Sequence, residues 1–183
     1  MTKVLRPPIK STSMGEDSNG KEPMTFAEPA ALHKVSEFHR LFRHPIGMTP
    51  GLPSEERCLL RINLLQEELN ELKEALANRD LVEAADALCD LQYVLSGAIH
   101  ELGLGDVFAE LFGEVHRSNM SKACQSLDEA KATVLHYQER HNIECDIETI
   151  DGLHLVYRRS DRKTLKSVAY SPADLASRLP QTP

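Results

Sequence analysis

The sequence lacks any run of 18 apolar residues, the length that a helix needs to cross a membrane. Its first residues, MTKVLRPPIK, also lack the apolar stretch of a secretory signal peptide. The four cysteines show no CxxC spacing, and at least Cys58 and Cys89 fall in helical patterns among apolar residues, where a thiol behaves as a small hydrophobe. We therefore expect a soluble, cytoplasmic protein with no membrane partner.

The chain also lacks an excess of positive charge. Lys and Arg number 21 against 28 Asp and Glu, which gives a formal net charge of -7. Because nucleic-acid phosphates select basic surfaces, this balance argues against nucleic acid as a partner, although an acidic protein can still bind nucleotides through metal ions. At 183 residues the chain is long enough to bury a hydrophobic core.

The order of elements predicts a tail followed by one domain. Residues 1–28 are rich in Ser, Gly, Pro and charge, so we expect a disordered tail, and residues 29–183 form a single domain. Apolar residues at helical spacing, with Ser54, Asp80 and Ser126 placed as caps, predict five helices. Their approximate ranges are 29–43, 54–77, 80–102, 106–118 and 126–141.

From about residue 143 the pattern changes to alternating runs. IECDIETI and LHLVYRR flank Asp151-Gly152, which predicts a β-hairpin with a type I′ turn. The short connection NRD makes the second and third helices an antiparallel pair. The predicted fold is an all-α helical bundle, with a four-helix core, one accessory helix and a small C-terminal β-hairpin.

LVEAADALCDLQYVL, residues 81–95, is apolar at almost every position yet carries Glu83, Asp86 and Asp90. At about 100° per residue these carboxylates lie within about 60° of one another. A helix that is apolar around most of its circumference should be largely buried, and a buried carboxylate is costly unless it is paired or bound to a cation. We therefore predict that this stripe binds a cation.

The preceding helix carries acids in LQEELNEL. Considered alone, Glu67, Glu68, Glu71 and Glu74 are better interpreted as a solvated polar face. If the two helices pair, however, five or six anionic groups converge from the set Glu67, Glu68, Glu71, Glu83, Asp86 and Asp90. Two like charges about 6 Å apart repel by about 3 kcal/mol at an effective dielectric of about 20. All-oxygen ligation favours Mg²⁺, with Mn²⁺ possible, over zinc. No histidine has a glutamate three residues before it, which excludes a di-iron carboxylate bundle.

Several residues outside the two helices are candidate substrate contacts. In isolation, Asn119 and Lys122 of HRSNMSK would be a helix cap or a surface charge, and His39 of EFHRLF a half-buried helix residue. Beside a metal cluster, they become candidates for contacts with a ribose, base or phosphate. The basic run after the hairpin adds Lys163 and Lys166 as substrate-binding candidates.

EELNE followed by EAAD resembles the EExxE and ExxD helices of the all-α nucleoside triphosphate pyrophosphohydrolases, the MazG-like superfamily. ADALCDLQYVLSG, NMSK, DRKTLKS and YSPADL are similar to its phosphoribosyl-ATP pyrophosphohydrolase-like branch. The resemblance covers about residues 30–179. It implies an all-helical, usually oligomeric core that hydrolyses a nucleoside triphosphate between its α and β phosphates with Mg²⁺.

The resemblance also assigns roles to residues. Glu67, Glu71, Glu83 and Asp86 match metal ligands, to which the stripe adds Asp90, and Glu68 matches the glutamate that positions or deprotonates water. Asn119 and Lys122 match the nucleotide-contacting pair. About 30 residues, a helix and the hairpin, separate NMSK from DRKTLKS, which is more than we expect in compact members.

The expected function is Mg²⁺-dependent hydrolysis of a nucleotide to a monophosphate and pyrophosphate, which would clear non-canonical or excess nucleotides. One alternative is phosphoribosyl-ATP hydrolysis in histidine biosynthesis, and another is a non-catalytic helical regulator that keeps the metal stripe for structure. Leu88, Leu91, Leu95 and Ile99 offer more apolar surface than one neighbouring helix can cover, so we expect a homodimer or homotetramer.

Overall fold

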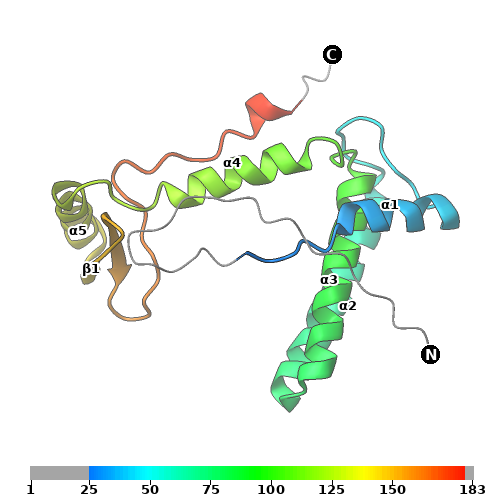
Figure 1. Cartoon of the computed structure of the whole chain (residues 1–183), viewed down its shortest axis with the longest axis horizontal. Helices are drawn as coiled ribbons and strands as arrows, with labels where there is room; N and C mark the ends of the chain where they lie inside the picture. Colours follow the sequence, from blue (N-terminus) through cyan, green and yellow to red (C-terminus); the bar gives the residue numbers. More distant parts are fainter. Residues whose placement is uncertain (1–24, 180–183) are drawn as a thin grey trace, which may run out of the picture.

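The computed structural model describes residues 25–179, so most of the predicted tail at 1–28 lies outside the described residues. The prediction of an all-α fold with a small C-terminal β-hairpin is confirmed (Figure 1). None of the helices in residues 25–179 is long and apolar enough to cross a membrane. The helices are α1 (Ala31–Phe42), α2 (Glu55–Asn78), α3 (Leu81–Glu101), α4 (Phe108–Met120) and α5 (Leu127–His141). They are followed by β1 (Cys145–Ile150), β2 (Leu153–Arg158) and a 3-10 helix, η1 (Ala176–Arg178).

The helices α2 and α3 form a long hairpin, as predicted from the short connection between them (Figure 1). The Asp80 carboxylate accepts hydrogen bonds from the backbone N–H groups of Val82 and Glu83, which caps the start of α3. Near this turn the buried side chains are small, namely Ala75 on α2 and Ala84 and Ala87 on α3. Small side chains allow two helices to approach closely, so the acids that flank these alanines are held near one another.

At the other end of this hairpin, α1 packs against α3. The carboxylate of Glu101 is buried there, with 1% of its side chain exposed, and it pairs with both Arg57 and Arg61 of α2. Burial alone would raise the pKa of Glu101, but hydrogen bonds from Arg61 and Arg57 outweigh it and hold the pKa below its ordinary value. This buried ion-pair network joins α2 to the end of α3.

The helix α5 and the β-hairpin form a second packed group. Val156, Leu165, Cys124 and Ala130 are buried in its core. The β1 and β2 strands are antiparallel, with Ile150 opposite Leu153. Positive φ angles at the two turn residues, 50° and 78°, are those of a type I′ turn, which confirms that prediction.

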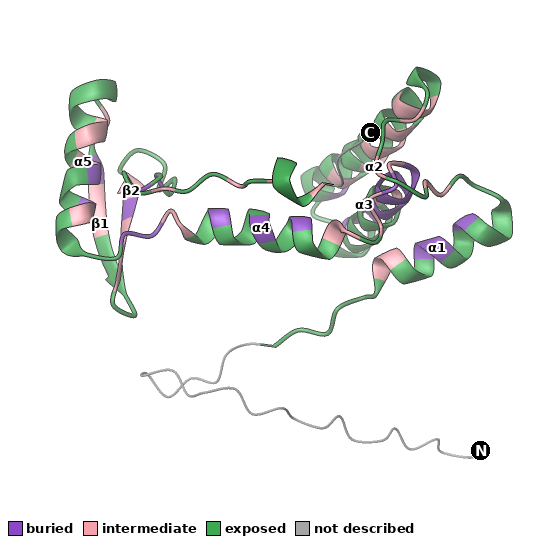
Figure 2. Cartoon of the chain, turned by 90° about the horizontal axis from the view of Figure 1, so that it is seen from above, coloured by how far each residue is buried: buried purple, intermediate pink, exposed green. Residues whose placement is uncertain are grey.

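The helix α4 runs between these two packed groups (Figures 1 and 2). Within one chain it does not close the predicted four-helix core, because it leads away from α1, α2 and α3 toward α5. After the hairpin the polypeptide returns along α4. We call this returning segment, residues 167–178, the C-terminal strap. The strap covers part of α4 in place of the other helices.

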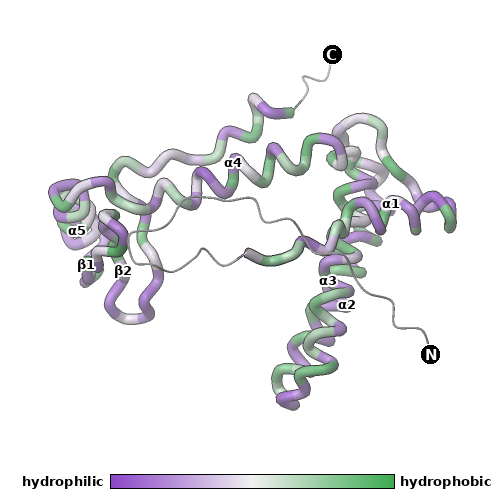
Figure 3. The backbone as a smooth tube through the Cα atoms, in the orientation of Figure 1, coloured by the Kyte–Doolittle hydropathy of each residue, from purple (hydrophilic) through white to green (hydrophobic). Residues whose placement is uncertain are grey.

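The apolar surface of α3 is not covered as the sequence suggested. Leu81 is 80% exposed and Leu88 is 55% exposed, and apolar residues recur along the whole α2–α3 hairpin (Figure 3). The expectation that Glu83, Asp86 and Asp90 sit on a largely buried helix is therefore wrong for the single chain, where all three are exposed. The physical reason is that α2 and α1 cover only part of the circumference of α3.

Candidate functional site

A pocket of about 390 Å³ opens between α2 and α3 near their connecting turn. Glu71 from α2 and Glu83 and Asp86 from α3 line it. Acids from both helices thus face one space, because the antiparallel hairpin brings the end of α2 beside the start of α3, whereas Glu67, Glu68 and Asp90 do not line this pocket. The other residues lining the pocket are Glu74, Ala75, Asn78 and Asp80.

Glu68 is half-buried on α2, one turn before Glu71. Burial raises the pKa of the Glu68 carboxyl, and the negative charges of Glu71, Asp90, Glu67 and Asp86 act in the same direction. The carboxylates of both helices are therefore close enough to interact electrostatically. Glu68 holds a proton more readily than an ordinary glutamate does.

Three polar residues of the pocket had not been singled out as site residues from the sequence: Glu74, Asn78 and Asp80. Glu74 and Asn78 lie three and seven residues after Glu71, which places them on the same side of α2. That spacing is visible in the sequence and could have indicated them. Asp80 was interpreted as a cap, a role that the structure confirms.

The donor set of this pocket fits a hard divalent cation. Its lining offers carboxylate and amide oxygens and no imidazole or thiolate, the ligands that Mg²⁺ prefers. In residues 25–179, no three acidic, histidine or cysteine side chains are already gathered tightly enough to share one ion. The fit thus rests on the chemistry of the lining and on the two helices that supply it.

His39 lies away from the acidic pocket. It is 3% exposed, and its Nδ1 is 2.8 Å from the carbonyl oxygen of Pro45. Its Nε2 is 3.4 Å from Nη2 of Arg61, and the ring faces Gly97, about three helical turns beyond Asp86. Burial lowers the pKa of His39, which favours the neutral imidazole. These contacts place His39 in the junction of α1, α2 and α3.

The other predicted substrate contacts lie at the far end of α4, where Asn119 is in its last turn, or beyond it. Lys122 donates a hydrogen bond of 2.7 Å to the side-chain oxygen of Asn119, at the end of that helix. The Nζ of Lys166 lies 4.3 Å from the centre of the Tyr170 ring, and Lys163 follows the β-hairpin. Since α4 has 13 residues and is about 20 Å long, one chain does not bring these groups to the acidic pocket (Figure 1).

One protein family matches the segment from α1 to α4. The family model for phosphoribosyl-ATP pyrophosphohydrolase matches residues 35–119, from within α1 to the end of α4. Residues 35–119 therefore form a domain of this family, which belongs to the MazG-like nucleotide pyrophosphohydrolase superfamily. A search of curated proteins gave no match to the chain.

This match of residues 35–119 supports nucleotide pyrophosphohydrolase activity in general, and the matched family is typically dependent on a divalent cation. The matched segment contains α2, α3 and the whole acidic pocket. It ends at Asn119, so Lys122, α5, the β-hairpin and the strap lie outside it.

Proposed function

We propose that this protein hydrolyses a nucleoside triphosphate between its α and β phosphates, in a Mg²⁺-dependent reaction that releases a monophosphate and pyrophosphate. The observation that carries the proposal is the pocket between α2 and α3, where Glu71, Glu83 and Asp86 line one open space. Glu68 is half-buried and interacts electrostatically with acids of both helices, and it differs from the lining acids in that its pKa is raised. The family match over this segment supports the same chemistry.

In this mechanism the carboxylates from both helices, with Glu71, Glu83 and Asp86 in the pocket, hold the cation. When bound, Mg²⁺ supplies charge neutralisation for the phosphates and acidifies water. Glu68 accepts the proton from the attacking water, because its raised pKa lies nearer to neutral pH, where a general base is most effective. Glu67 and Asp90 add negative charge around Glu68 and complete the proposed metal-binding set.

The proposed substrate is a (deoxy)nucleoside triphosphate, and the proposed role is the clearance of unwanted nucleotides. Phosphoribosyl-ATP is the second candidate, and the description of the matching family favours it. Both substrates carry the same triphosphate, so the acidic pocket serves either one. The difference between them lies in the groups that contact the base and sugars.

No lysine or arginine lines the pocket of one chain, and the proposed nucleotide-contacting pair, Asn119 and Lys122, lies at the other end of α4 (Figure 1). We propose that a second copy of the chain supplies them, in a homodimer or homotetramer. The exposed apolar residues of α3, including Leu81 and Leu88, offer the surface for that association.

The test is a substrate panel of dUTP, dCTP, the standard triphosphates and phosphoribosyl-ATP, with products followed by ³¹P NMR in Mg²⁺ and in EDTA. We expect a monophosphate and pyrophosphate in Mg²⁺ only, and a turnover by Glu68→Gln that is at least about 100-fold lower. Orthophosphate and a diphosphate as the first products would contradict the reaction. Mg²⁺ binding without turnover of any substrate would instead favour a non-catalytic regulator.

A further inference from the structure

Two histidine rings join α1 to the helices beside it, and in residues 25–179 no other side-chain hydrogen bond does so. His100 of α3 donates from Nε2 to the carbonyl oxygen of Leu32, at the start of α1, over 2.7 Å. His39, near the end of α1, has its Nε2 3.4 Å from Nη2 of Arg61 on α2. His39 and His100 are 3% and 7% exposed. The polar attachment of α1 therefore depends on buried histidine, the side-chain type whose charge ordinarily changes near neutral pH.

The hydrogen-bond partners of His39 fix its tautomer. Nδ1 lies 2.8 Å from the carbonyl oxygen of Pro45, which can only accept, so Nδ1 carries the proton. Nε2 faces the guanidinium of Arg61, which can only donate, so Nε2 presents its lone pair. A second proton, on Nε2, would point at this guanidinium and replace an attraction with a repulsion. The neutral ring therefore fits this position, and the imidazolium ion does not.

The junction of α1, α2 and α3 already holds more positive than negative charge. The Glu101 carboxylate pairs with both Arg57 and Arg61, so one anion faces two cations. Nε of Arg61 is buried and has no hydrogen-bond partner in the part of the chain that the structure describes. A proton on His39 would thus add to an uncompensated positive charge at a site that is closed to water, which is costly.

The titration of His39 follows from these surroundings. Burial lowers its pKa, and this effect outweighs the hydrogen bond to Pro45, which raises the pKa. Positive charge on Arg61, on His100 of α3 and on His44 after α1 lowers it further, and the two histidine rings lie 5.8 Å and 5.4 Å from that of His39. Because the pKa is lower in the folded than in the unfolded state, the native contacts of His39 lose stability as pH falls below the ordinary value of 6.5.

We propose that His39 is a pH-sensitive switch, whose neutral ring holds α1 against α2 and α3 and whose protonation releases α1 from them. This switch goes beyond the proposed hydrolysis, because none of its groups lines the acidic pocket. The Glu68 carboxyl responds in the opposite sense, since its raised pKa makes the metal-free protein more stable as pH falls. A loss of α1 packing on acidification is therefore a property of the junction and not of the acidic pocket.

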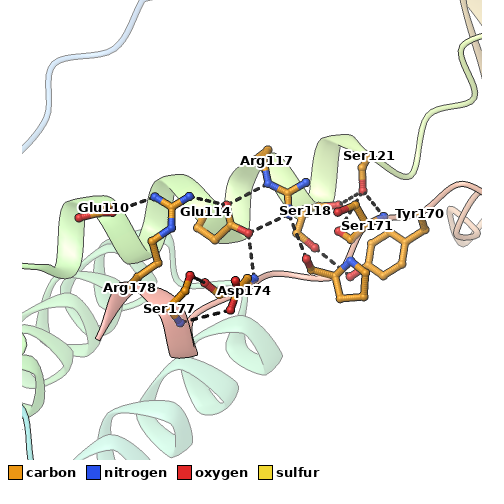
Figure 4. Close-up of polar contacts among 11 residues, drawn as sticks. Glu110, Glu114, Arg117, Ser118, Ser121, Tyr170, Ser171, Asp174, Ser177 and Arg178 are labelled. Carbon is orange, nitrogen blue, oxygen red and sulfur yellow. Dashed lines mark hydrogen bonds and ion pairs between the residues drawn. The ribbon is translucent and has the colours of Figure 1, made fainter. Parts of the chain in front are cut away.

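The first test measures hydrogen–deuterium exchange in the full-length protein in EDTA, one pH unit above and one below 6.5, with correction for intrinsic exchange rates. The helix α4 is the internal reference, because the Glu114 carboxylate that fixes the strap on it stays ionised in this range (Figure 4). Hydrogen bonds from Arg117 and from the Asp174 backbone lower the pKa of Glu114 to about 2. We expect the protection of α1 to fall by up to about ten-fold relative to that of α4, the effect of one proton over this range.

The second test compares His39→Asn with His33→Asn. The amide in His39→Asn can still donate to the carbonyl oxygen of Pro45 but does not titrate, so the ratio of α1 to α4 protection should no longer depend on pH. His33 lies on the same helix with a side chain that is 73% exposed, and His33→Asn should keep the response of wild type.

The proposal is overturned if the wild-type ratio does not change with pH, or if His39→Asn still follows wild type. If His39→Asn does not fold, the histidine NMR signals of wild type decide, since the absence of any midpoint below the ordinary value of 6.5 would also overturn it. Because these measurements use no metal, nucleotide or turnover, their failure is distinct from a failure to hydrolyse nucleotides.

Discussion

Glu68 differs from the other carboxylates of the α2–α3 hairpin in its surroundings. It is half-buried and faces acids of both helices, whereas Glu71, Glu83 and Asp86 are exposed around the pocket. The same type of side chain can therefore serve two purposes at one site. A carboxylate with a raised pKa suits proton transfer, and exposed carboxylates around an open pocket suit cation binding.

The raised pKa of Glu68 predicts a pH-dependent effect of Glu68→Gln on the metal-free protein. When the pKa of a carboxyl is higher in the folded than in the unfolded state, the free energy of unfolding falls as pH rises above the ordinary glutamate pKa. Glu68→Gln should therefore melt at a higher temperature than wild type at neutral pH and at a similar temperature near pH 4. Glu139→Gln on α5 is the control. Equal melting curves for Glu68→Gln and wild type at neutral pH would contradict the expected crowding.

A second prediction separates Glu68 from Asp86. Glu68→Gln should lower turnover by at least about 100-fold while leaving Mg²⁺ affinity nearly unchanged, because only proton transfer is lost. Asp86→Asn should abolish turnover, weaken Mg²⁺ binding and raise the melting temperature in EDTA, because it removes one of several like charges. Mg²⁺ at about 100 times its dissociation constant should stabilise wild type by roughly 2.7 kcal/mol. Equal losses of Mg²⁺ affinity in the two variants would refute this division of roles.

At the scale of secondary-structure elements, the positions of α2 and α3 depend on a buried charge. Glu101 accepts from Arg61 at 2.7 Å and also pairs with Arg57, although these residues are about 40 positions apart in the chain. If the carboxylate is removed, the positive charges of the two arginines remain partly buried without a partner, which is costly. The network thus holds the end of the hairpin that lies opposite the acidic pocket.

Glu101→Gln should destabilise the protein by about 3 to 5 kcal/mol, the usual cost of removing one partner from a buried ion pair. Glu110→Gln is the matched control, because Glu110 pairs with Arg178 at 2.8 Å but is 57% exposed. That surface pair should contribute no more than about 1 kcal/mol. Urea unfolding of the two variants checks this prediction. If both variants unfold at similar midpoint concentrations of urea, the buried network contributes no more stability than the surface pair.

At the scale of the whole molecule, the chain leaves much apolar surface uncovered. Leu81, Leu88 and Leu95 recur every seven residues on α3 and are 80%, 55% and 42% exposed. At about 100° per residue they lie on the side of α3 opposite Asp86 and the acidic pocket. A second copy can therefore cover this row without blocking the pocket.

We expect the wild type to sediment as a dimer or larger assembly at micromolar concentration. The double variant Leu88→Glu/Leu95→Glu should shift it toward monomer, because charges on this row oppose burial. Leu127→Glu/Leu135→Glu on α5, where both leucines are also about half exposed, is the control and should leave the assembly unchanged. A monomeric wild type would contradict the proposed role of a second copy.

The sequence by itself determined the features that depend on neighbouring residues. Helix periods, the cap at Asp80 and the type I′ turn at Asp151-Gly152 follow from local backbone chemistry, so the helices and the β-hairpin were predicted close to their observed bounds. The acidic stripe of α3 was visible for the same reason, because a helical period fixes which side chains share a face. The short connection to α2 then placed Glu71 and Asp86 around one pocket.

Only the tertiary structure decided which distant segments meet. Nothing in a local period shows that Tyr170 contacts Ser118, 52 residues earlier, or that Glu101 pairs with Arg57. Nor does the apolar face of α4 reveal whether its own chain or another copy covers it. The hydrophobic effect is non-directional, so an apolar face can pack on any matching apolar surface. For this reason the sequence did not show that, within one chain, α4 leaves the predicted four-helix core and separates the acidic pocket from Lys122.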